Sequence, residues 1–449
     1  MIIPKRLITQ YDTSETLVMI SLYPKKGERY STGVSGLASY AKNVITPMNH
    51  LTIVLADYDK KPAIYKEGKT LVVRCFQTNS PFMWLDIFRT LIQFSHAKNV
   101  LIQHDFSVYG SMIVSALIVP FLTILRLFGF TISIVLHHVV TDIFKLAGHV
   151  GLKNTFFDRM RGHVYNILFK GFYTLVGVVS TNIVVLEESL KTRLSSVILK
   201  QKITTIPHGV DTSLTTIPKK DARTVLGIKK DDYVIMFFGF VNWFKGADFF
   251  ADTFSDKSHI LGKKIHGIIA GGESSTMKGR TYYQTFYNSV AKTVCSSPTL
   301  SMTGYILQED IQTYFSAADL VVFPYRNCMT ASGVLSLTFS YGKPFIISQP
   351  LDEMFEAQDF KKNMKELGLS IGDLTFDLKK ESCLACTENI LKNGLRDKMR
   401  NLSIQMRETR DYAKTAKEYQ KLLSAPKHRW VVTPNPKLAK LYSAIGMLF

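Results

Sequence analysis

The sequence predicts an α/β protein in which two doubly wound domains face each other across a cleft. Its length of 449 residues exceeds one ordinary domain, and a hydrophobic content of 46% is sufficient for large cores. Short apolar runs alternate with helical patterns in the first half, and a second such series runs from Tyr233 to about Ser370. Pro207-His208-Gly209 separates the two series as a hinge. We therefore expect one domain at 1–205 and another at 206–410.

The predicted strands of the first domain are short runs without charged residues, as expected for parallel strands buried on both faces. They include the segments 71–73, 100–102 and 183–185. A longer uncharged stretch, 106–125, has the length of a membrane span. Serine, threonine and proline side chains dilute it, and Arg126 follows directly. We expect a helix that is buried or touches a membrane rather than one that crosses it.

The segment from Thr303 to Ile347 contains the most informative pattern of the second domain. The apolar run 320–323 predicts a buried strand, and the polar loop after it leads to Ser332 and Gly333. Serine is favoured as a helix N-cap, and glycine lets a ligand approach the backbone closely. Because free N–H groups at a helix start attract anions, this position is a candidate phosphate site.

These residues resemble the donor-binding segment of glycosyltransferase family 4, the retaining group 1 glycosyltransferases of the GT-B fold. Six further segments resemble motifs of that family and occur in the family's order. They are, in chain order, 31–40, 102–110, 134–139, 206–211, 237–246 and 268–272. The resemblance covers roughly residues 20 to 423. A final helix from Tyr412 to Leu423 resembles the family helix that crosses back, so we expect 411–449 to pack on the first domain.

The resemblance implies two Rossmann-like domains and transfer of a hexose from a nucleotide-sugar to a glycan or lipid-linked acceptor, with no cofactor and no metal. Lys245 would neutralise the departing diphosphate and His137 would face the donor sugar, while His104 and Asp105 would line the acceptor side. His137 and His138 are neighbours on a strand, so at most one of them is expected to face the cleft. The other expected donor-binding residues are Gly33, Val34, Gly239, Asn242, Gly272, Ile306, Ser332, Gly333 and Val334.

Two departures from the family pattern keep other functions open. Many members carry two glutamates around the donor helix, and Met329 and Leu337 occupy those positions here. An arginine often found before the lysine is also absent, with Phe240 and Asn242 at the candidate sites. The alternatives are a degenerate, non-catalytic GT-B protein that binds a sugar or nucleotide, and a nucleotide-sugar epimerase. An epimerase would need carboxylate acid–base partners, which the two apolar residues do not supply.

The charge of +19 predicts anionic partners, either the donor or an anionic membrane surface. No nucleic-acid recognition motif is present. The tail after Leu423 has no acidic residue and combines basic with aromatic side chains, as in segments that lie at a membrane interface. Five scattered cysteines suit a reducing compartment, and the N-terminus lacks the pattern of a secretory signal. We expect a cytoplasmic protein, either free in the cytoplasm or peripheral at the inner face of the membrane.

Overall fold

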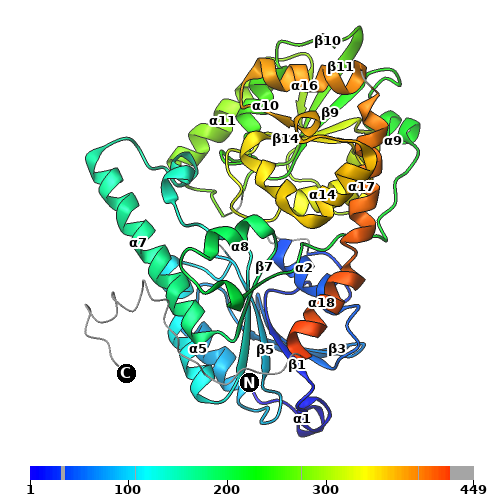
Figure 1. Ribbon diagram of the computed structural model, residues 1–449. Coiled ribbons are helices and arrows are strands. Elements are labelled where there is room, and N and C mark those ends of the chain that lie inside the picture. The colour runs from blue at the N-terminus through cyan, green and yellow to red at the C-terminus, as the bar shows by residue number, and fades with distance from the viewer. Residues whose placement is uncertain (32–35, 107, 275, 393, 425–449) are drawn as a thin grey trace.

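The structure, a computed structural model, describes residues 1–424 except 32–35, 107, 275 and 393. Figure 1 shows two α/β units, one above the other, and in each of them helices flank a sheet. The described part of the first half forms an eight-stranded sheet in the order β3-β4-β2-β1-β5-β6-β7-β8. Its strands are β1 (Leu17–Ile20), β2 (Thr52–Asp57), β3 (Ala63–Glu67), β4 (Thr70–Phe76), β5 (Asn99–His104), β6 (Thr131–Leu136), β7 (Asn182–Val185) and β8 (Ile203–Thr205).

All neighbours in this sheet are parallel except β3 and β4. In β1, Leu17 is in register with Thr52 of β2 on one side and Asn99 of β5 on the other. Val18 and Ile20 enter the core on one face, and Leu17 and Met19 enter the core on the other. The strand is uncharged because both of its faces are buried.

Helices cover both faces of the first sheet. They are α1 (Lys5–Tyr11), α2 (Gly36–Ile45), α3 (Met83–Leu91), α4 (Met112–Ala116), α5 (Ile118–Leu127), η1 (Ile143–Leu146), α6 (Ala147–Val150), α7 (Phe156–Val179), α8 (Glu188–Leu194) and η2 (Lys200–Lys202). The uncharged stretch 106–125 forms α4 and most of α5, each with one buried side. Across the described residues, every helix is too short or too polar to span a bilayer.

The second sheet has the order β10-β11-β9-β13-β14-β15, with β12 beside β11. Its strands are β9 (Tyr233–Phe238), β10 (His259–Ile260), β11 (Lys263–Ala270), β12 (Leu300–Met302), β13 (Leu320–Phe323), β14 (Phe345–Ser348) and β15 (Thr375–Phe376). Among the described strands of this second sheet, only the short pair β10–β11 is antiparallel. The predicted doubly wound character of both halves is thus confirmed, and β15 extends slightly beyond the expected end.

The helices of the second half pack around this sheet and then return to the first. They are α9 (Lys219–Val225), α10 (Ala247–Phe254), α11 (Thr281–Cys295), α12 (Ile311–Ala317), α13 (Gly333–Ser340), η3 (Gln349–Glu356), α14 (Gln358–Leu367), α15 (Ile371–Leu374), α16 (Lys380–Lys392), α17 (Leu395–Thr409) and α18 (Tyr412–Ser424). Helix α18 packs against α2, where the hydroxyls of Tyr419 and Tyr40 lie 2.9 Å apart. Residues 425–449 of the expected C-terminal segment lie outside the described part.

The chain crosses between the two sheets twice, and the two crossings run side by side. Val210 N donates to Arg410 O at 2.7 Å, and Tyr412 N donates to Val210 O at 3.2 Å. Val210 and Asp411 thereby form a parallel bridge. We propose the domain boundary at 205/206, directly before the first crossing.

Candidate functional site

Lys245 lies in the loop that follows β9, at the carboxyl edge of the second sheet. β9 ends at Phe238, and Gly239 follows with φ +115°, a backbone conformation that favours glycine. A Cβ at Gly239 would lie 2.8 Å from Lys245 Nζ and 3.3 Å from Val334 Cγ2. The ammonium group of Lys245 is therefore close to both the Gly239 backbone and the first turn of α13.

Asn242 fixes the loop that carries this lysine. The Asn242 side chain is buried, and its Oδ1 accepts a hydrogen bond from Lys245 N at 3.1 Å. Burial lowers the pKa of Lys245 to about 8. Within the described part of the chain, no carboxylate lies within salt-bridge distance of its Nζ. Near neutral pH, Lys245 thus presents a positive charge that an anionic ligand can neutralise.

Helix α13 begins beside that charge. Ser332 is its N-cap, and the Ser332 Oγ accepts from Leu335 N at 3.2 Å. The amides of Gly333 and Val334 belong to the first turn, where backbone N–H groups have no partner inside a helix. The positive end of the helix dipole and the Lys245 ammonium therefore act on the same place, as a phosphate site requires.

The glycine turn after β11 lies against the same loop. A Cβ at Gly271 would approach Gly239 O to 1.9 Å, and one at Gly272 would approach Tyr305 N to 2.5 Å. Ile306 follows this contact and packs partly buried against the core of the second sheet. Gly272 and Ile306 thus shape the neighbourhood of the Gly239 loop through close packing. The other expected glycine loop, with Gly33 and Val34, lies outside the described residues.

In the first domain, His137 follows β6 and is held in a buried cluster of polar and aromatic side chains. Its Nε2 lies 2.8 Å from Gln103 Oε1, and its ring packs edge-on against Tyr40 at a centroid distance of 5.0 Å. The residue is only 7% exposed, and burial lowers the pKa of His137 to about 3. The imidazole is therefore neutral and fixed in orientation.

The structure places His104 elsewhere than the sequence led us to expect. Its ring is 1% exposed and contacts the rings of Phe106 and Phe172 at 4.9 and 5.4 Å. Burial lowers the pKa of His104 to about 4. Consecutive side chains of a strand point to opposite faces, so when Gln103 turns toward His137, His104 turns into the apolar layer. His104 does not reach the open edge of the sheet.

Asp105 instead pairs with His138, a residue that sequence reasoning left aside in favour of His137. Asp105 Oδ2 and His138 Nδ1 lie 3.0 Å apart, with 13% and 22% of the two side chains exposed. Burial opposes a charge on His138, but the charge of Asp105 and its hydrogen bond outweigh burial and raise the pKa of His138. The alternation of side chains along a strand was the signal that could have identified this pair.

This segment also joins the two domains directly. His138 and Thr330 form an antiparallel bridge, and Val139 N donates to Met329 O at 3.0 Å. Thr330 lies in the loop that leads to Ser332 and α13. The contact brings the Asp105–His138 pair to the loop before the candidate phosphate site.

His208 connects the hinge to α13. Its Nδ1 lies 2.9 Å from Ser336 Oγ and 2.8 Å from Gly209 O. A Cβ at Gly333 would lie 3.9 Å from the other ring nitrogen, Nε2. Burial lowers the pKa of His208 to about 4. A neutral histidine thus positions the start of α13 relative to the hinge.

Apolar side chains fill the two positions at which the resemblance led us to look for glutamates. Met329 is 7% exposed within the core of the second domain, and Leu337 packs partly buried against that core. Neither side chain can hydrogen-bond a sugar or ribose hydroxyl. These two positions therefore offer no carboxylate to a ligand bound beside α13.

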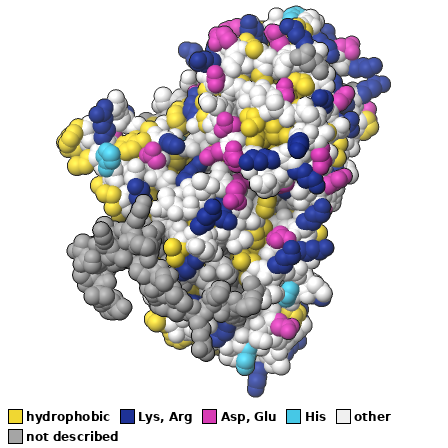
Figure 2. Space-filling model, in the orientation of Figure 1, with side chains coloured by type: hydrophobic (Ala, Val, Ile, Leu, Met, Phe, Trp, Pro, Cys, Tyr) yellow, Lys and Arg dark blue, Asp and Glu magenta, His cyan; other side chains and the backbone are white. Residues whose placement is uncertain are grey.

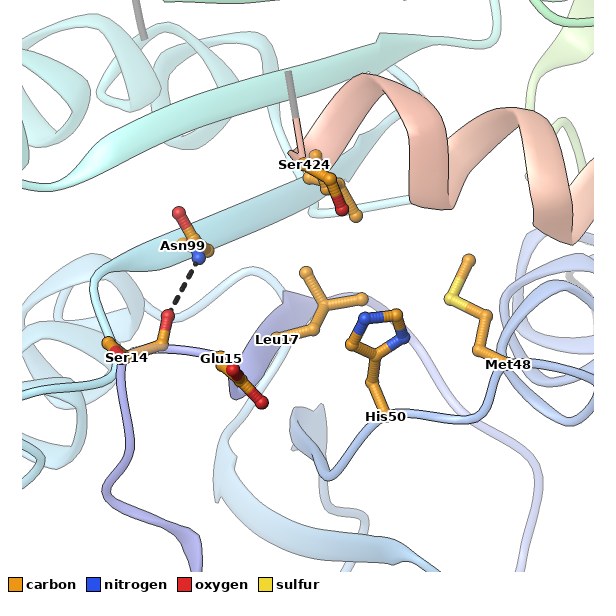
Figure 3. A pocket seen from close by; sticks show the side chains of 8 residues that line it. Ser14, Glu15, Leu17, Met48, His50, Asn99 and Ser424 are labelled. Atoms are coloured by element: carbon orange, nitrogen blue, oxygen red, sulfur yellow. Dashed lines mark hydrogen bonds between the residues drawn. The ribbon is translucent and has the colours of Figure 1, made fainter. Parts of the chain in front are cut away.

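A hollow of about 350 Å³ lies at the opposite edge of the first sheet. Figure 3 shows Leu17, Met48 and His50 around it, with Ser14, Glu15 and Asn99 on one side and Ser424 at the end of α18. Leu17 and Asn99 begin their strands, whereas ligands of open α/β sheets bind at the carboxyl ends. This hollow is distinct from the candidate phosphate site beside Lys245 and α13.

Two facing doubly wound α/β sheets define the GT-B fold, and the candidate anion site lies at the carboxyl ends of the strands in the second sheet. Residues 232–362 match the family described as "Glycosyl transferases group 1". The resemblance to group 1 glycosyltransferases is therefore confirmed: the family segment contains β9, Lys245 and α13, and the described chain has the GT-B fold. No curated protein sequence matches the chain at a significant level.

Solved structures are similar over nearly the whole chain. Sucrose-phosphate synthase from Thermosynechococcus elongatus has 14% identity and a TM-score of 0.63, covering 92% of this chain and 100% of that one. Anabaena HepE in complex with UDP-glucose has 12% identity and a TM-score of 0.62, with the same coverage. WaaG, a glycosyltransferase involved in lipopolysaccharide biosynthesis, has 11% identity and a TM-score of 0.59, covering 91% and 100%. At these identities the similarity establishes the fold.

Proposed function

We propose that this protein is a retaining glycosyltransferase that moves a hexose from a nucleotide-sugar donor to a glycan or lipid-linked acceptor. The observation that carries the proposal is the position of Lys245 Nζ, without a carboxylate partner in the described chain, beside Gly239 and the start of α13. A lysine and a helix N-terminus that act on one place suit a diphosphate, whose negative charge grows as it leaves.

A UDP-sugar is the proposed donor. HepE, which has the same fold, was solved in complex with UDP-glucose. In this chain, Ser332, Gly333 and Val334 would hold the diphosphate together with Lys245, and Asn242 would keep the lysine loop in place. Gly239, Gly272 and Ile306 would let the backbone approach the nucleotide closely.

In the proposed reaction, the bond between the sugar C1 and the β-phosphate oxygen breaks, and a bond from C1 to the acceptor oxygen forms on the same face. The acceptor hydroxyl gives its proton to the departing phosphate oxygen, so the protein need not supply a nucleophile. Lys245 and the amides of Gly333 and Val334 would stabilise the charge that develops on the diphosphate. His137 would contact the donor sugar, since Gln103 already fixes its orientation.

On the acceptor side we propose Asp105 together with His138, rather than with His104. The pair is partly exposed and touches the loop before α13, so it is placed to orient an acceptor hydroxyl. The acceptor itself we propose to be a glycan or a lipid-linked sugar, met by a cytoplasmic protein at the inner face of a membrane. The structural similarity to WaaG, a lipopolysaccharide glycosyltransferase, supports this class of acceptor.

A second candidate function is a GT-B protein that binds a nucleotide or sugar without turnover. Met329 and Leu337 favour it, because apolar side chains stand where two carboxylates would contact the donor. The same residues count against an epimerase, which would need acid–base partners around the sugar.

The test is to incubate the full chain with a panel of nucleotide sugars and to measure released nucleotide, with and without lipid-linked sugars. Calorimetry on the same samples measures binding separately from turnover. Lys245→Ala should lose affinity for UDP, and Lys292→Ala, an exposed lysine on α11, serves as the control. Release of UDP supports the transferase, whereas binding without release from any donor favours the non-catalytic protein.

A further inference from the structure

The outward sides of α5 and α7 are apolar, although helices that cover a sheet normally turn a polar side to solvent. Among the described residues, most of the exposed large hydrophobic side chains lie on one group of helices of the first domain. We call the following residues the α5–α7 face: Met112, Ile113, Leu117, Ile124, Leu127, Phe128, Phe157, Met160, Val164, Ile167, Leu168, Leu175 and Val178. Figure 2 shows apolar side chains gathered where α7 projects from the body of the molecule.

Helix α7 has two separate apolar sides. One is buried against the first domain through residues such as Tyr173 and Val176. The other consists of exposed side chains three or four residues apart, interrupted only at Gly171, and is open to solvent. Its exposed fractions are 75% at Phe157, 52% at Met160, 48% at Val164, 70% at Ile167, 47% at Leu175 and 44% at Val178. A solvent-facing apolar stripe of this length indicates a binding surface.

A second stripe on α4 and α5 adjoins the first. Ile113, Leu117, Ile124 and Leu127 recur at helical spacing and are all exposed. Helix α5 packs directly on α7, and both contribute buried residues to the same core on one face of the first sheet. The two stripes therefore belong to one layer of the molecule.

Positive charges flank the apolar residues of α7. Arg159, Arg161 and Lys170 lie on this helix, and its only acidic residue, Asp158, is already bonded to Arg161 at 3.0 Å and to Lys153 N at 2.9 Å. A hollow of about 420 Å³ beside the helix is lined in part by Lys153, Arg159 and His163. The surface is thus complementary to a partner that is apolar inside and anionic at its edge.

We propose that the α5–α7 face docks on a lipid bilayer that contains anionic lipid. The apolar side chains would enter the boundary between headgroups and acyl chains, and the basic groups would contact lipid phosphates. The biological reason for docking rests on the proposed function, since docking would hold the cleft near a lipid-linked acceptor. The surface itself is argued independently of that function. It extends the membrane hypothesis from the C-terminal tail to a defined surface of the first domain.

The test is flotation of the full chain with phosphatidylcholine vesicles, with and without about 30% phosphatidylserine. The double variant Phe157→Ser/Ile167→Ser should lower the vesicle-bound fraction about tenfold or more, because both side chains are exposed and lie on the stripe. The matched control, Val225→Ser/Ile371→Ser, removes two side chains that are 74% and 44% exposed on the second domain. Arg159→Glu/Lys170→Glu should weaken binding more than Lys220→Glu/Lys292→Glu, which changes net charge equally.

Several results would overturn the proposal. The stripe variant could bind vesicles as well as the wild type, or the control variants could lose binding equally. Binding lost only on truncation after Ser424 would assign it to the C-terminal tail. Sedimentation could instead reveal a dimer that the stripe variant breaks, with no vesicle binding by the wild type, and the face would then join two copies. UDP affinity, measured on each variant, separates the docking proposal from the proposed transferase function. A variant that no longer floats with vesicles but still binds UDP has lost only the membrane contact of the α5–α7 face.

Discussion

The imidazole of His138 and the carboxylate of Asp105 lie 3.0 Å apart at the edge where the two domains meet. Asp105 directly follows β5, and His138 follows β6, so two neighbouring parallel strands deliver the pair to one place. We predict that the pKa of His138 lies above that of an ordinary histidine and that Asp105→Asn lowers it. Nitrogen-15 NMR of labelled histidines would measure this, with His138→Gln to assign the signal.

The same pair predicts a direction for the pH dependence of stability. A histidine whose pKa is raised on folding stabilises the protein below its unfolded pKa of about 6.5, and this contribution is lost as the pH rises through the folded value. Asp105→Asn should therefore cost more stability at about pH 6 than at about pH 8.5. Urea unfolding at both values gives the difference, and an equal cost at both would contradict the pairing.

Lys245 predicts proton uptake on nucleotide binding. Its pKa is lowered by burial to about 8, and a bound diphosphate would raise it again. At about pH 8, calorimetry in two buffers of different ionisation enthalpy should therefore register uptake of a fraction of a proton. Lys245→Arg keeps the charge and should abolish the uptake, while Lys245→Ala should weaken UDP binding by about 1.5–3 kcal/mol. Uptake that persists in Lys245→Arg would assign the proton to another group.

Gly271 makes a close backbone contact that any side chain would break. An added Cβ would lie 1.9 Å from Gly239 O, so Gly271→Ala must displace the loop that carries the lysine. We expect about tenfold weaker UDP binding or more, together with a stability loss of about 1–3 kcal/mol. Gly171→Ala on α7 is the control, since a Cβ there meets nothing within 4 Å. A Gly271→Ala protein with normal UDP affinity would show that the loop can move freely.

We predict that replacing Arg410, which lies at the hinge, strongly lowers the stability of the protein. It is 4% exposed, donates from Nη1 to Glu187 at 2.7 Å and from Nε to Asp359 at 2.6 Å, and so connects the two domains. Arg410→Met would leave Glu187 buried without its partner, at a cost of about 3–5 kcal/mol. Burial already raises the pKa of Glu187, so the cost should shrink as the pH falls and this carboxyl takes up a proton. Thermal unfolding measures it, and Arg410→Met/Glu187→Gln should recover part of the loss.

The fold was largely predictable because its signals are local in the sequence. The run 320–323 became the fully buried strand β13, and Ser332 became the N-cap of α13. The alternation of side chains along a strand also indicated that at most one of His137 and His138 faces the cleft. The bridge from His138 to Thr330 could not be predicted, because it joins segments far apart in the chain and carries no periodic signal.

The exposed side of α7 shows a second feature that the sequence alone could not predict. Its spacing of three and four residues is the same for a helix side that packs in a core and for one that faces solvent. Only the three-dimensional arrangement separates the buried Tyr173 from the exposed Ile167. His104 was misplaced for a related reason, since the sequence does not say which face of β5 lies toward the second domain.

The paired chain crossings at Val210 and Asp411 set how the two halves can move. Because two linkers that are hydrogen-bonded side by side resist sliding and twisting, we expect the two halves to move mainly by rotation about the line that the linkers share. Opening along this coordinate must separate Val139 N from Met329 O, and the same rotation would give passage to both nucleotide and acceptor. If the proposed transferase uses this one opening for nucleotide and acceptor, release of one and entry of the other share a rate, and solvent viscosity should slow both in equal proportion.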